Sequence, residues 1–258
     1  LVSEGETKRG LDKIILKGYE KFPNAYLKRY LKIKPSNTFN IEAIKNKITA
    51  LDNLRFANQI KPPEVLFSKD TTTLYVYLEK RQSNSFDGFL GFSTDEETNK
   101  LDFNGYLDLE LINNFNYGES FALLYKSNEN EEKNFEVKLN LPYLFESPIG
   151  SELELNIFKK DSSFTTVNQI AKLFYQVNPQ TSIYFGINST NSNNLLDEEN
   201  TTPEIQDYNS NIYNIRLTYN KLQNNFLFNK SLFLELEVGN GKRNFSNNSE
   251  NQTFLLID

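Results

Sequence analysis

The 258-residue sequence contains no cysteine, histidine, methionine or tryptophan. Without cysteine, the chain has no disulfide framework and no thiolate chemistry. Without histidine as well, it cannot form a Ser-His-Asp triad, a Cys-His pair or the usual zinc sites. The sequence also lacks a P-loop, a dinucleotide-binding fingerprint and a Gly-x-Ser-x-Gly elbow. We therefore predict that the protein is not an enzyme and has no catalytic residue, cofactor or metal site.

A net positive charge and long apolar runs are also missing. The net charge is −6 and no basic block stands out, which disfavours nucleic acid as a partner. No run approaches the roughly 18 apolar residues of a transmembrane helix. A transmembrane strand needs only about 9–11 residues, half of them facing lipid, so a membrane β-barrel is compatible with this composition. The 21 Phe and 14 Tyr suit the aromatic girdles of a barrel or the core of a soluble sandwich.

The N-terminus does not have the pattern of a signal peptide. Leu1 is followed neither by a charged n-region nor by an apolar h-region. For an exported protein, we therefore expect the chain to be a mature or internal segment. Residues 3–10 read as the end of an earlier strand and a connector.

The residues up to Arg81 have the pattern of a small α/β domain. The expected elements are a strand at Leu11–Gly18, a helix at Asn24–Leu31 behind Pro23, a helix at Ile41–Leu51 capped by Asn40, and a hairpin of Glu64–Phe67 and Thr72–Leu78. Pro62-Pro63 is expected to break the chain before the hairpin. The element order is therefore β-α-α-β-β.

After Arg81 the sequence alternates between apolar and polar residues, and we predict nine or ten strands. The apolar sets are Phe103, Gly105, Leu107, Leu109 and Leu111; Phe135, Val137, Leu139 and Leu141; Leu153, Leu155 and Ile157; and Leu232, Leu234, Leu236 and Val238. An alternation with a period of two residues fits either a soluble β-sandwich or a barrel with one face toward lipid. We interpret carboxylate pairs such as Asp108 and Glu110 as lining a wet lumen rather than as a catalytic pair. The acidic runs Glu131-Glu132 and Asp197–Glu199 read as solvated loops rather than cation sites.

The lengths of the connections favour the barrel. One set is short: 113–118, 146–150 and 178–180. The alternate set is polar and longer: 94–99, 128–134, 189–210 and 240–251, with the short turn at 161–163 as an exception. Short turns on one side and long loops on the other are typical of outer-membrane barrels.

The N-terminal pattern resembles a POTRA domain, the periplasmic module of the BamA/TamA-type outer-membrane assembly superfamily. That resemblance rests on Ile15–Gly18, on Phe39 before the second helix and on Leu54-Arg55-Phe56 before the second strand. Phe86–Phe92, the strand after Leu101 and residues 140–150 resemble the barrel of the same superfamily. The resemblance implies an α+β POTRA-like domain followed by antiparallel transmembrane β-barrel strands. We place a connector at 1–10, the POTRA-like domain at 11–82 and the first nine or ten barrel strands at 83–258.

The sequence departs from this superfamily in three respects: the number of strands, a loop motif and the C-terminus. Family barrels have sixteen strands, and the Arg-Gly-Phe motif of their inward loop is absent here. The chain ends at Phe254–Asp258 without an aromatic C-terminus. Because an open sheet edge is unstable in lipid, we expect a partial barrel whose closing strands lie elsewhere.

The resemblance also implies a function and a site. It implies outer-membrane protein assembly or translocation, with the N-terminal domain in the periplasm. The implied partners are unfolded outer-membrane client polypeptides, outer-membrane lipid and accessory assembly subunits. The expected sites are a lateral-gate strand with Ser85, Phe86, Gly88, Phe89, Gly91 and Phe92, and a POTRA edge strand with Thr72, Leu74, Val76 and Leu78.

Three alternatives stay open. The glycines of the gate strand could simply make room for aromatic neighbours or for a kink. The protein could be a passive porin or a structural barrel with a periplasmic domain. It could also be a soluble β-rich binding protein.

Overall fold

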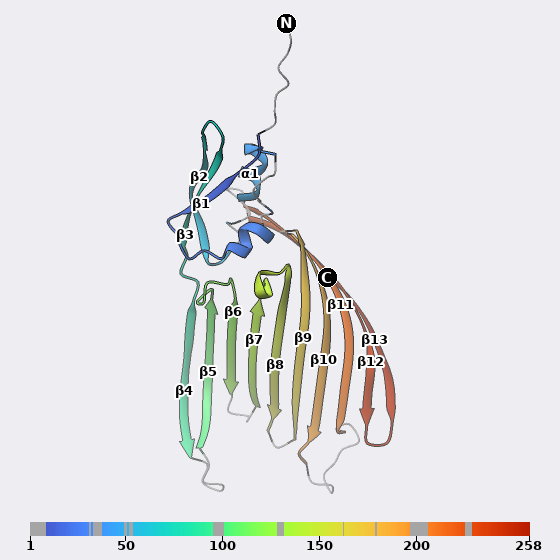
Figure 1. The fold of residues 1–258 in the computed structure, drawn as a ribbon. Coiled ribbons are helices and arrows are strands. Elements are labelled where there is room, and N and C mark those ends of the chain that lie inside the picture. The colour runs from blue at the N-terminus through green and yellow to red at the C-terminus, as the bar shows by residue number, and fades with distance from the viewer. Residues whose placement is uncertain are drawn as a thin grey trace. The chain divides into compact units, whose positions relative to one another are not determined.

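The computed structural model describes residues 9–30, 32, 38–48, 51, 54–94, 101–127, 132–161, 163–178, 180–196, 206–224 and 229–258. Contacts divide the chain into two compact units, Leu1–Ser83 with Asn113–Gly118 and Asn84–Ile112 with Glu119–Asp258. The first unit is a small α/β domain and the second is a long-stranded sheet (Figure 1). Among the described residues, no helix is long and apolar enough to cross a membrane. The domain limits at 11–82 and 83–258 remain a prediction.

The described part of the first unit has three strands and two helical segments. In chain order they are β1 (Lys13–Lys17), a π-helical turn (Tyr26–Tyr30), α1 (Ile41–Ile48), β2 (Ala57–Phe67) and β3 (Thr72–Lys80). β3 is the central strand, with β1 parallel on one side and β2 antiparallel on the other. The predicted β-α-α-β-β order is confirmed.

Both predicted helices are found in the described part of the chain. The side chain of Asn40 caps α1, because its Oδ1 accepts a hydrogen bond from the backbone N of Ala43 at 3.0 Å. α1 ends at Ile48, and residues 49 and 50 lie outside the described part of the chain. The first helical segment covers residues 24–30: it begins as α-helix at residues 24 and 25 and continues as the π-helical turn at Tyr26–Tyr30, and residue 31 lies outside the described part of the chain.

The core of the first unit combines strand, helix and aromatic residues. Leu74, Val76 and Leu78 of β3, Ile48 of α1 and Leu51 are 0% exposed. An aromatic cluster of Tyr19, Phe22, Tyr26 and Phe56 adds to it, with ring centroids of neighbouring members 5.2–6.3 Å apart. Each such buried side chain contributes about 1.5–3 kcal/mol, so this unit has a core of its own.

The structure corrects the predicted POTRA edge strand. Thr72, Leu74, Val76 and Leu78 lie on β3, the central strand of the sheet, and their side chains are at most 1% exposed. The prediction was wrong because it treated β3 as the outer strand of a hairpin, whereas β1 pairs with its second edge. Asp12 fixes this pairing: its Oδ2 accepts a hydrogen bond from the backbone N of Thr72 at 2.7 Å. β1 and β2 are therefore the edges of the described three-stranded sheet.

The prediction that Pro62-Pro63 breaks the chain was also wrong. β2 continues through both prolines, and its register against β3 shifts between Gln59 and Lys61 and again between Lys61 and Glu64. Proline is tolerated on an edge strand because its missing N–H faces away from the ladder or falls at a bulge.

The second unit is a ten-stranded antiparallel sheet in which each strand pairs with its neighbours along the chain. The strands are β4 (Ser85–Thr94), β5 (Leu101–Ile112), β6 (Ser120–Ser127), β7 (Glu132–Leu141), β8 (Ile149–Lys160), β9 (Phe164–Asn178), β10 (Thr181–Asn194), β11 (Tyr208–Asn224), β12 (Asn229–Phe245) and β13 (Ser249–Ile257). A 3-10 turn at Leu144–Glu146 follows β7. β4 and β13 form the two ends of the sheet.

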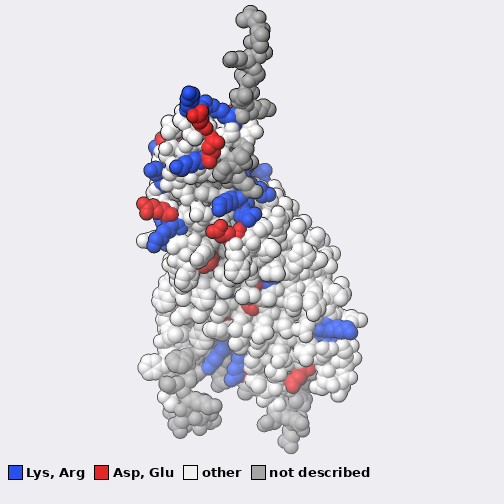
Figure 2. All heavy atoms as spheres, viewed as in Figure 1, with Lys and Arg blue, Asp and Glu red and all other residues white. Residues whose placement is uncertain are grey.

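One face of this sheet is apolar. Directly opposite residues of paired strands share a face, so the register defines lateral rows across the strands. One such row, from β4 to β8, is Phe86, Leu109, Leu123, Val137 and Leu155. The predicted alternating sets of β7, β8 and β12 fall on this same face. Charged side chains are accordingly sparse over the strands in Figure 2, whereas they gather over the first unit.

The other face carries ion pairs that join distant strands. Lys172 Nζ of β9 lies 3.6 Å from Glu237 Oε1 of β12. Arg216 of β11 contacts Glu152 of β8 at 3.0 Å and Glu235 of β12 at 3.8 Å. Neighbouring strands are about 4.8 Å apart, so side chains from strands three apart meet only on the inner side of a curved sheet. The polar face is therefore concave and the apolar face is convex.

The strands β10 to β13 are longer than predicted. The predicted loop 240–251 is mostly strand, since β12 ends at Phe245 and β13 begins at Ser249. These Asn- and Ser-rich stretches have a low strand propensity. Cross-strand hydrogen bonds compensate: Asn240 Nδ2 donates to Thr253 Oγ1 at 2.8 Å, and Asn244 Nδ2 donates to Asn209 Oδ1 at 3.0 Å. The predicted loop 94–99 lies almost wholly outside the described residues.

Candidate functional site

β4 has one strand neighbour, β5, among the described residues. All six residues predicted for the gate strand lie on β4: Ser85, Phe86, Gly88, Phe89, Gly91 and Phe92. The backbone N–H and C=O groups along its second edge can therefore pair with a further strand. The structure places the predicted residues together on this edge, and their role as a gate stays a prediction.

β4 presents aromatic side chains on both faces. Phe86 and Phe92 lie on the convex face and are 68% and 77% exposed. Phe89 lies on the concave face and is 66% exposed. A cluster of exposed large apolar side chains marks an interaction surface, with lipid or with another polypeptide.

Two glycines bring the backbones of β4 and β5 close together. A Cβ atom added at Gly105 would lie 2.2 Å from the backbone O of Phe89, and one at Gly88 would lie 2.6 Å from the backbone O of Tyr106. Gly105 also has a φ of +129°, which residues with a side chain rarely adopt. Gly91 is different, because a Cβ atom there would make only ordinary contact at 3.7 Å. The close approach therefore depends on Gly88 and Gly105, whereas the sequence pointed to Gly88 and Gly91.

We expect Gly105→Ala to weaken the pairing of β4 with β5. The new methyl group would collide with the backbone and strain φ, at a cost of about 1–3 kcal/mol. Gly91→Ala on the neighbouring strand is the matched control, and we expect it to be neutral or stabilising by up to about 1 kcal/mol. Urea unfolding of the protein as produced in the cell, in detergent micelles, measures both. Equal effects of the two substitutions would contradict the close-approach argument.

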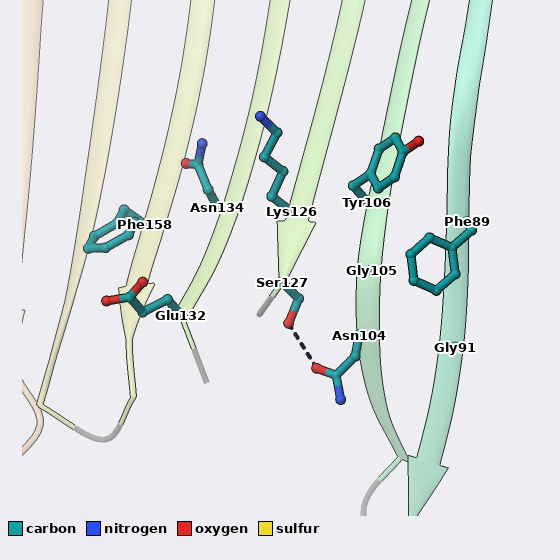
Figure 3. A pocket seen from close by; sticks show the side chains of 10 residues that line it. All are labelled: Phe89, Gly91, Asn104, Gly105, Tyr106, Lys126, Ser127, Glu132, Asn134 and Phe158. Atoms are coloured by element: carbon teal, nitrogen blue, oxygen red, sulfur yellow. Dashed lines mark hydrogen bonds between the residues drawn. The ribbon is translucent and has the colours of Figure 1, made fainter. Parts of the chain in front are cut away.

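A pocket of about 710 Å³ opens on the concave face beside β4. One lateral row from β4 to β8 lines it, namely Phe89, Tyr106, Lys126, Asn134 and Phe158. Figure 3 shows Phe89 beside Tyr106 on one side of the pocket and Phe158 on the other. The rings of Phe89 and Tyr106 meet edge to face at 5.9 Å.

The pocket has the chemistry of a binding surface for peptide side chains. Its lining offers two apolar rings, amide groups, the ammonium group of Lys126 and the carboxylate of Glu132. Tyr106 is held in place by its hydroxyl group, which donates to Asp87 Oδ2 at 3.1 Å. Alternation along the sequence places Lys126 and Phe158 on one face, but only the register across five strands reveals that they line one pocket.

The described part of the chain does not contain a cluster of acidic residues suited to a metal ion. Within it, no group of three or more Asp or Glu residues is arranged to hold a metal ion. Glu131 and Asp197–Glu199, which the sequence suggested as solvated acids, lie outside the described residues.

The first unit has a second candidate surface at its sheet edges. On β2, Lys61 Nζ donates to Glu64 Oε1 at 2.5 Å, and the Tyr77 hydroxyl group donates to Glu64 Oε2 at 2.5 Å. The hydrogen bond from Lys61 lowers the pKa of Glu64, and the bond to Glu64 raises the pKa of Tyr77. Prolines and bulges discourage an edge from pairing with another strand, and both occur on β2 but not on β1, so β1 is the less protected edge.

Known proteins match the chain in sequence and in structure. Residues 11–81 match the POTRA family model, described as a surface antigen variable number repeat. BamA from Haemophilus ducreyi lacking POTRA domains 1–3 matches with a TM-score of 0.57 at 14% identity, over 91% of this chain and 51% of that chain. CdiB from Acinetobacter baumannii matches with a TM-score of 0.57 at 13% identity, over 96% of this chain and 48% of that chain. Comparison with curated proteins gives no match.

These matches define a class of fold, a POTRA domain followed by an antiparallel sheet like that of BamA and CdiB. The chain shares the fold of these two structures, in agreement with the resemblance seen in the sequence. It spans about half the length of the two matched structures.

Proposed function

We propose that the protein is an outer-membrane assembly or translocation factor that acts through its POTRA domain and through β4 as a lateral-gate strand. The observation that supports this most directly is the position of β4. It is the end strand of the sheet, it has exposed aromatic residues, and a pocket adjoins it on the concave face.

The proposed mechanism is strand addition. An extended client segment pairs with the free edge of β4, and each backbone hydrogen bond contributes about 0.5–1.5 kcal/mol. Alternate client side chains then face the apolar convex side and the pocket beside Phe89. The step needs no cofactor and no covalent chemistry.

The proposed location is the outer membrane, with the N-terminal domain in the periplasm. The POTRA domain would receive unfolded clients at a sheet edge, and β1 replaces the wrongly predicted β3 in that role. Unfolded outer-membrane polypeptides, outer-membrane lipid and accessory assembly subunits remain the proposed partners.

A crosslinking experiment in living cells tests the gate. A photo-crosslinking amino acid at Phe89 is expected to capture client polypeptide, because β4 pairs with β5 alone among the described strands. The same substitution at Phe158 is the matched control. Both residues line the same pocket, but Phe158 lies on β8, which is paired on both sides. We expect severalfold more client at Phe89. Equal capture at the two positions would refute β4 as the gate.

A passive porin is the second candidate, and the charged concave face favours it. Lys138 of β7 contacts Glu136 at 2.6 Å and Glu154 at 3.8 Å. Such side chains could set the ion preference of a pore. Planar-bilayer recordings separate the two functions. Large, steady conductance, together with unchanged levels of other barrels after depletion of the protein, would favour the porin.

A further inference from the structure

A polar pocket lies at the end of the sheet where β4, β10 and β12 finish (Figure 1). Its volume of about 570 Å³ is within the range of small-molecule binding sites. Residues from the end of β10, from just before β11 and from the hairpin of β12 and β13 line it. The polar lining includes Gln206, Asp207, Ser246, Asn247 and Glu250, and Phe245 contributes an aromatic ring.

Hydrogen bonds and a ring contact hold this lining in place. The backbone N of Asn194 donates to Asp207 Oδ1 at 2.5 Å, which ties the end of β10 to the residue before β11. The backbone N of Phe245 donates to the backbone O of Asn248 at 2.8 Å and closes the turn after β12. The rings of Phe245 and Tyr208 are 5.9 Å apart. The pocket is therefore formed before a ligand arrives, which lowers the ordering cost of binding.

Several polar side chains of the pocket are available to a ligand. The side chains of Gln206, Asn247 and Glu250 are exposed, and within the described part of the chain they make no hydrogen bond or ion pair. Each amide group can both donate and accept, whereas the carboxylate accepts only. The pocket therefore offers donors and acceptors to one ligand.

The charge of the lining selects among ligand classes. Asp207 and Glu250 are acidic, and no lysine or arginine is among the lining residues that the structure describes, so an anionic ligand would be repelled. A bare metal ion would not fill 570 Å³, and within the described residues no group of three or more acidic side chains is arranged to hold one. A basic peptide would gain little from Glu250, because ion pairs with exposed carboxylates are weak. A neutral ligand rich in hydroxyl groups fits best.

We propose that this pocket binds a neutral hexose, free or as a unit of a saccharide chain. Each sugar hydroxyl group both donates and accepts a hydrogen bond, so neighbouring hydroxyl groups match the amides of Gln206 and Asn247 and the carboxylate of Glu250. The C–H groups on one side of the sugar ring match the electron-rich face of Phe245. The proposal rests on the proposed function only for the orientation that turns this end of the sheet toward the outside of the cell.

Direct binding of saccharides tests the proposal. The protein as produced in the cell is purified in a zwitterionic detergent, because a detergent with a sugar head group would compete for the pocket. Hexamers of glucose, galactose and mannose are titrated into it, and binding is followed by saturation-transfer NMR. We expect at least one hexamer to bind, and polygalacturonate, a chain of acidic sugars, to bind at least tenfold more weakly. Binding of none of the three hexamers, or tighter binding of polygalacturonate, would overturn the proposal.

Two neighbouring substitutions on β13 locate the site. Glu250→Ala should weaken binding about tenfold, because it removes charge-assisted hydrogen bonds to the sugar. Asn251→Ala is the matched control: Asn251 is the next residue of the strand, but it pairs with Lys242 on the opposite face. We expect less than about a twofold change for Asn251→Ala. Equal losses for the two variants would show that the sugar binds elsewhere and would overturn the proposal.

Two further comparisons test the class of ligand. Phe245→Leu should weaken hexose binding severalfold, because leucine has no aromatic face. A lysine hexapeptide that binds more tightly than every neutral hexamer, with the same dependence on Glu250, would make the pocket a peptide site and refute the proposal. The single hexose and its hexamer distinguish a free sugar, which would bind as tightly as the hexamer, from a saccharide chain, which would bind more tightly. These readouts do not involve client polypeptides, so a failure of client capture at Phe89 leaves them unaffected.

Discussion

Replacing Lys172 by methionine is expected to destabilise the sheet by about 3–5 kcal/mol. Lys172 and Glu237 are only 8% and 10% exposed, and their charged atoms lie 3.6 Å apart. Removing the lysine leaves a nearly buried carboxylate without its partner, which is the costly way to break such a pair. Urea unfolding of the protein as produced in the cell, in detergent micelles, measures the change.

Two variants control this prediction. Lys138 pairs with Glu136 on the same concave face, but its side chain is 51% exposed. Lys138→Met should therefore cost only about 0–1 kcal/mol. Combining Lys172→Met with Glu237→Leu should recover much of the loss, because no unpaired charge then remains. A loss for Lys172→Met no larger than that for Lys138→Met would show that water reaches the Lys172 pair in the detergent-solubilised protein.

Leu109→Arg is expected to destabilise the barrel by about 2–4 kcal/mol if Leu109 lies near the middle of the bilayer. Leu109 belongs to the convex row of Phe86 and Leu123, where a guanidinium group would face lipid. Asp108→Arg is the matched control on the next residue. Its side chain lies on the concave face and is exposed, so a charge is tolerated there.

The two substitutions are compared by unfolding in lipid vesicles, where the convex face meets hydrocarbon. A similar cost for both would mean that the convex face does not contact lipid. That result would favour the soluble β-rich binding protein that the sequence left open.

Period-two patterns allowed the faces of the sheet to be predicted from sequence, because a strand places alternate residues on opposite sides. The cap at Asn40 was predictable for a similar reason, since it depends on residues three apart. The central position of β3 in its sheet could not be predicted from the sequence. It depends on the parallel pairing of Lys13–Lys17 with Thr73–Tyr77, and no local pattern records which strand lies between the other two.

The candidate site was only partly predictable. The sequence identified β4 because glycine and phenylalanine concentrate there, and the structure places this strand at the end of the sheet. Gly105 was missed as a site of close approach, because its effect arises from the backbone O of Phe89 on another strand. The pocket was missed because Phe89 and Phe158 are brought together by four successive pairings of strands.

The ion pair between Lys172 and Glu237 has a consequence for folding. Strands rich in Asn, Ser and Gly, such as β10, specify their register weakly and are prone to slip. Lys172 reaches across β10 and β11 to β12, in space left by Gly186, whose added Cβ would lie 2.6 Å from Lys172 Cγ. A slip of two residues at one intervening pairing would separate the two charges by about 7 Å along the strands. The pair can therefore form only when two hairpins have joined in the correct alignment, so it stabilises that alignment over one that has slipped by two residues.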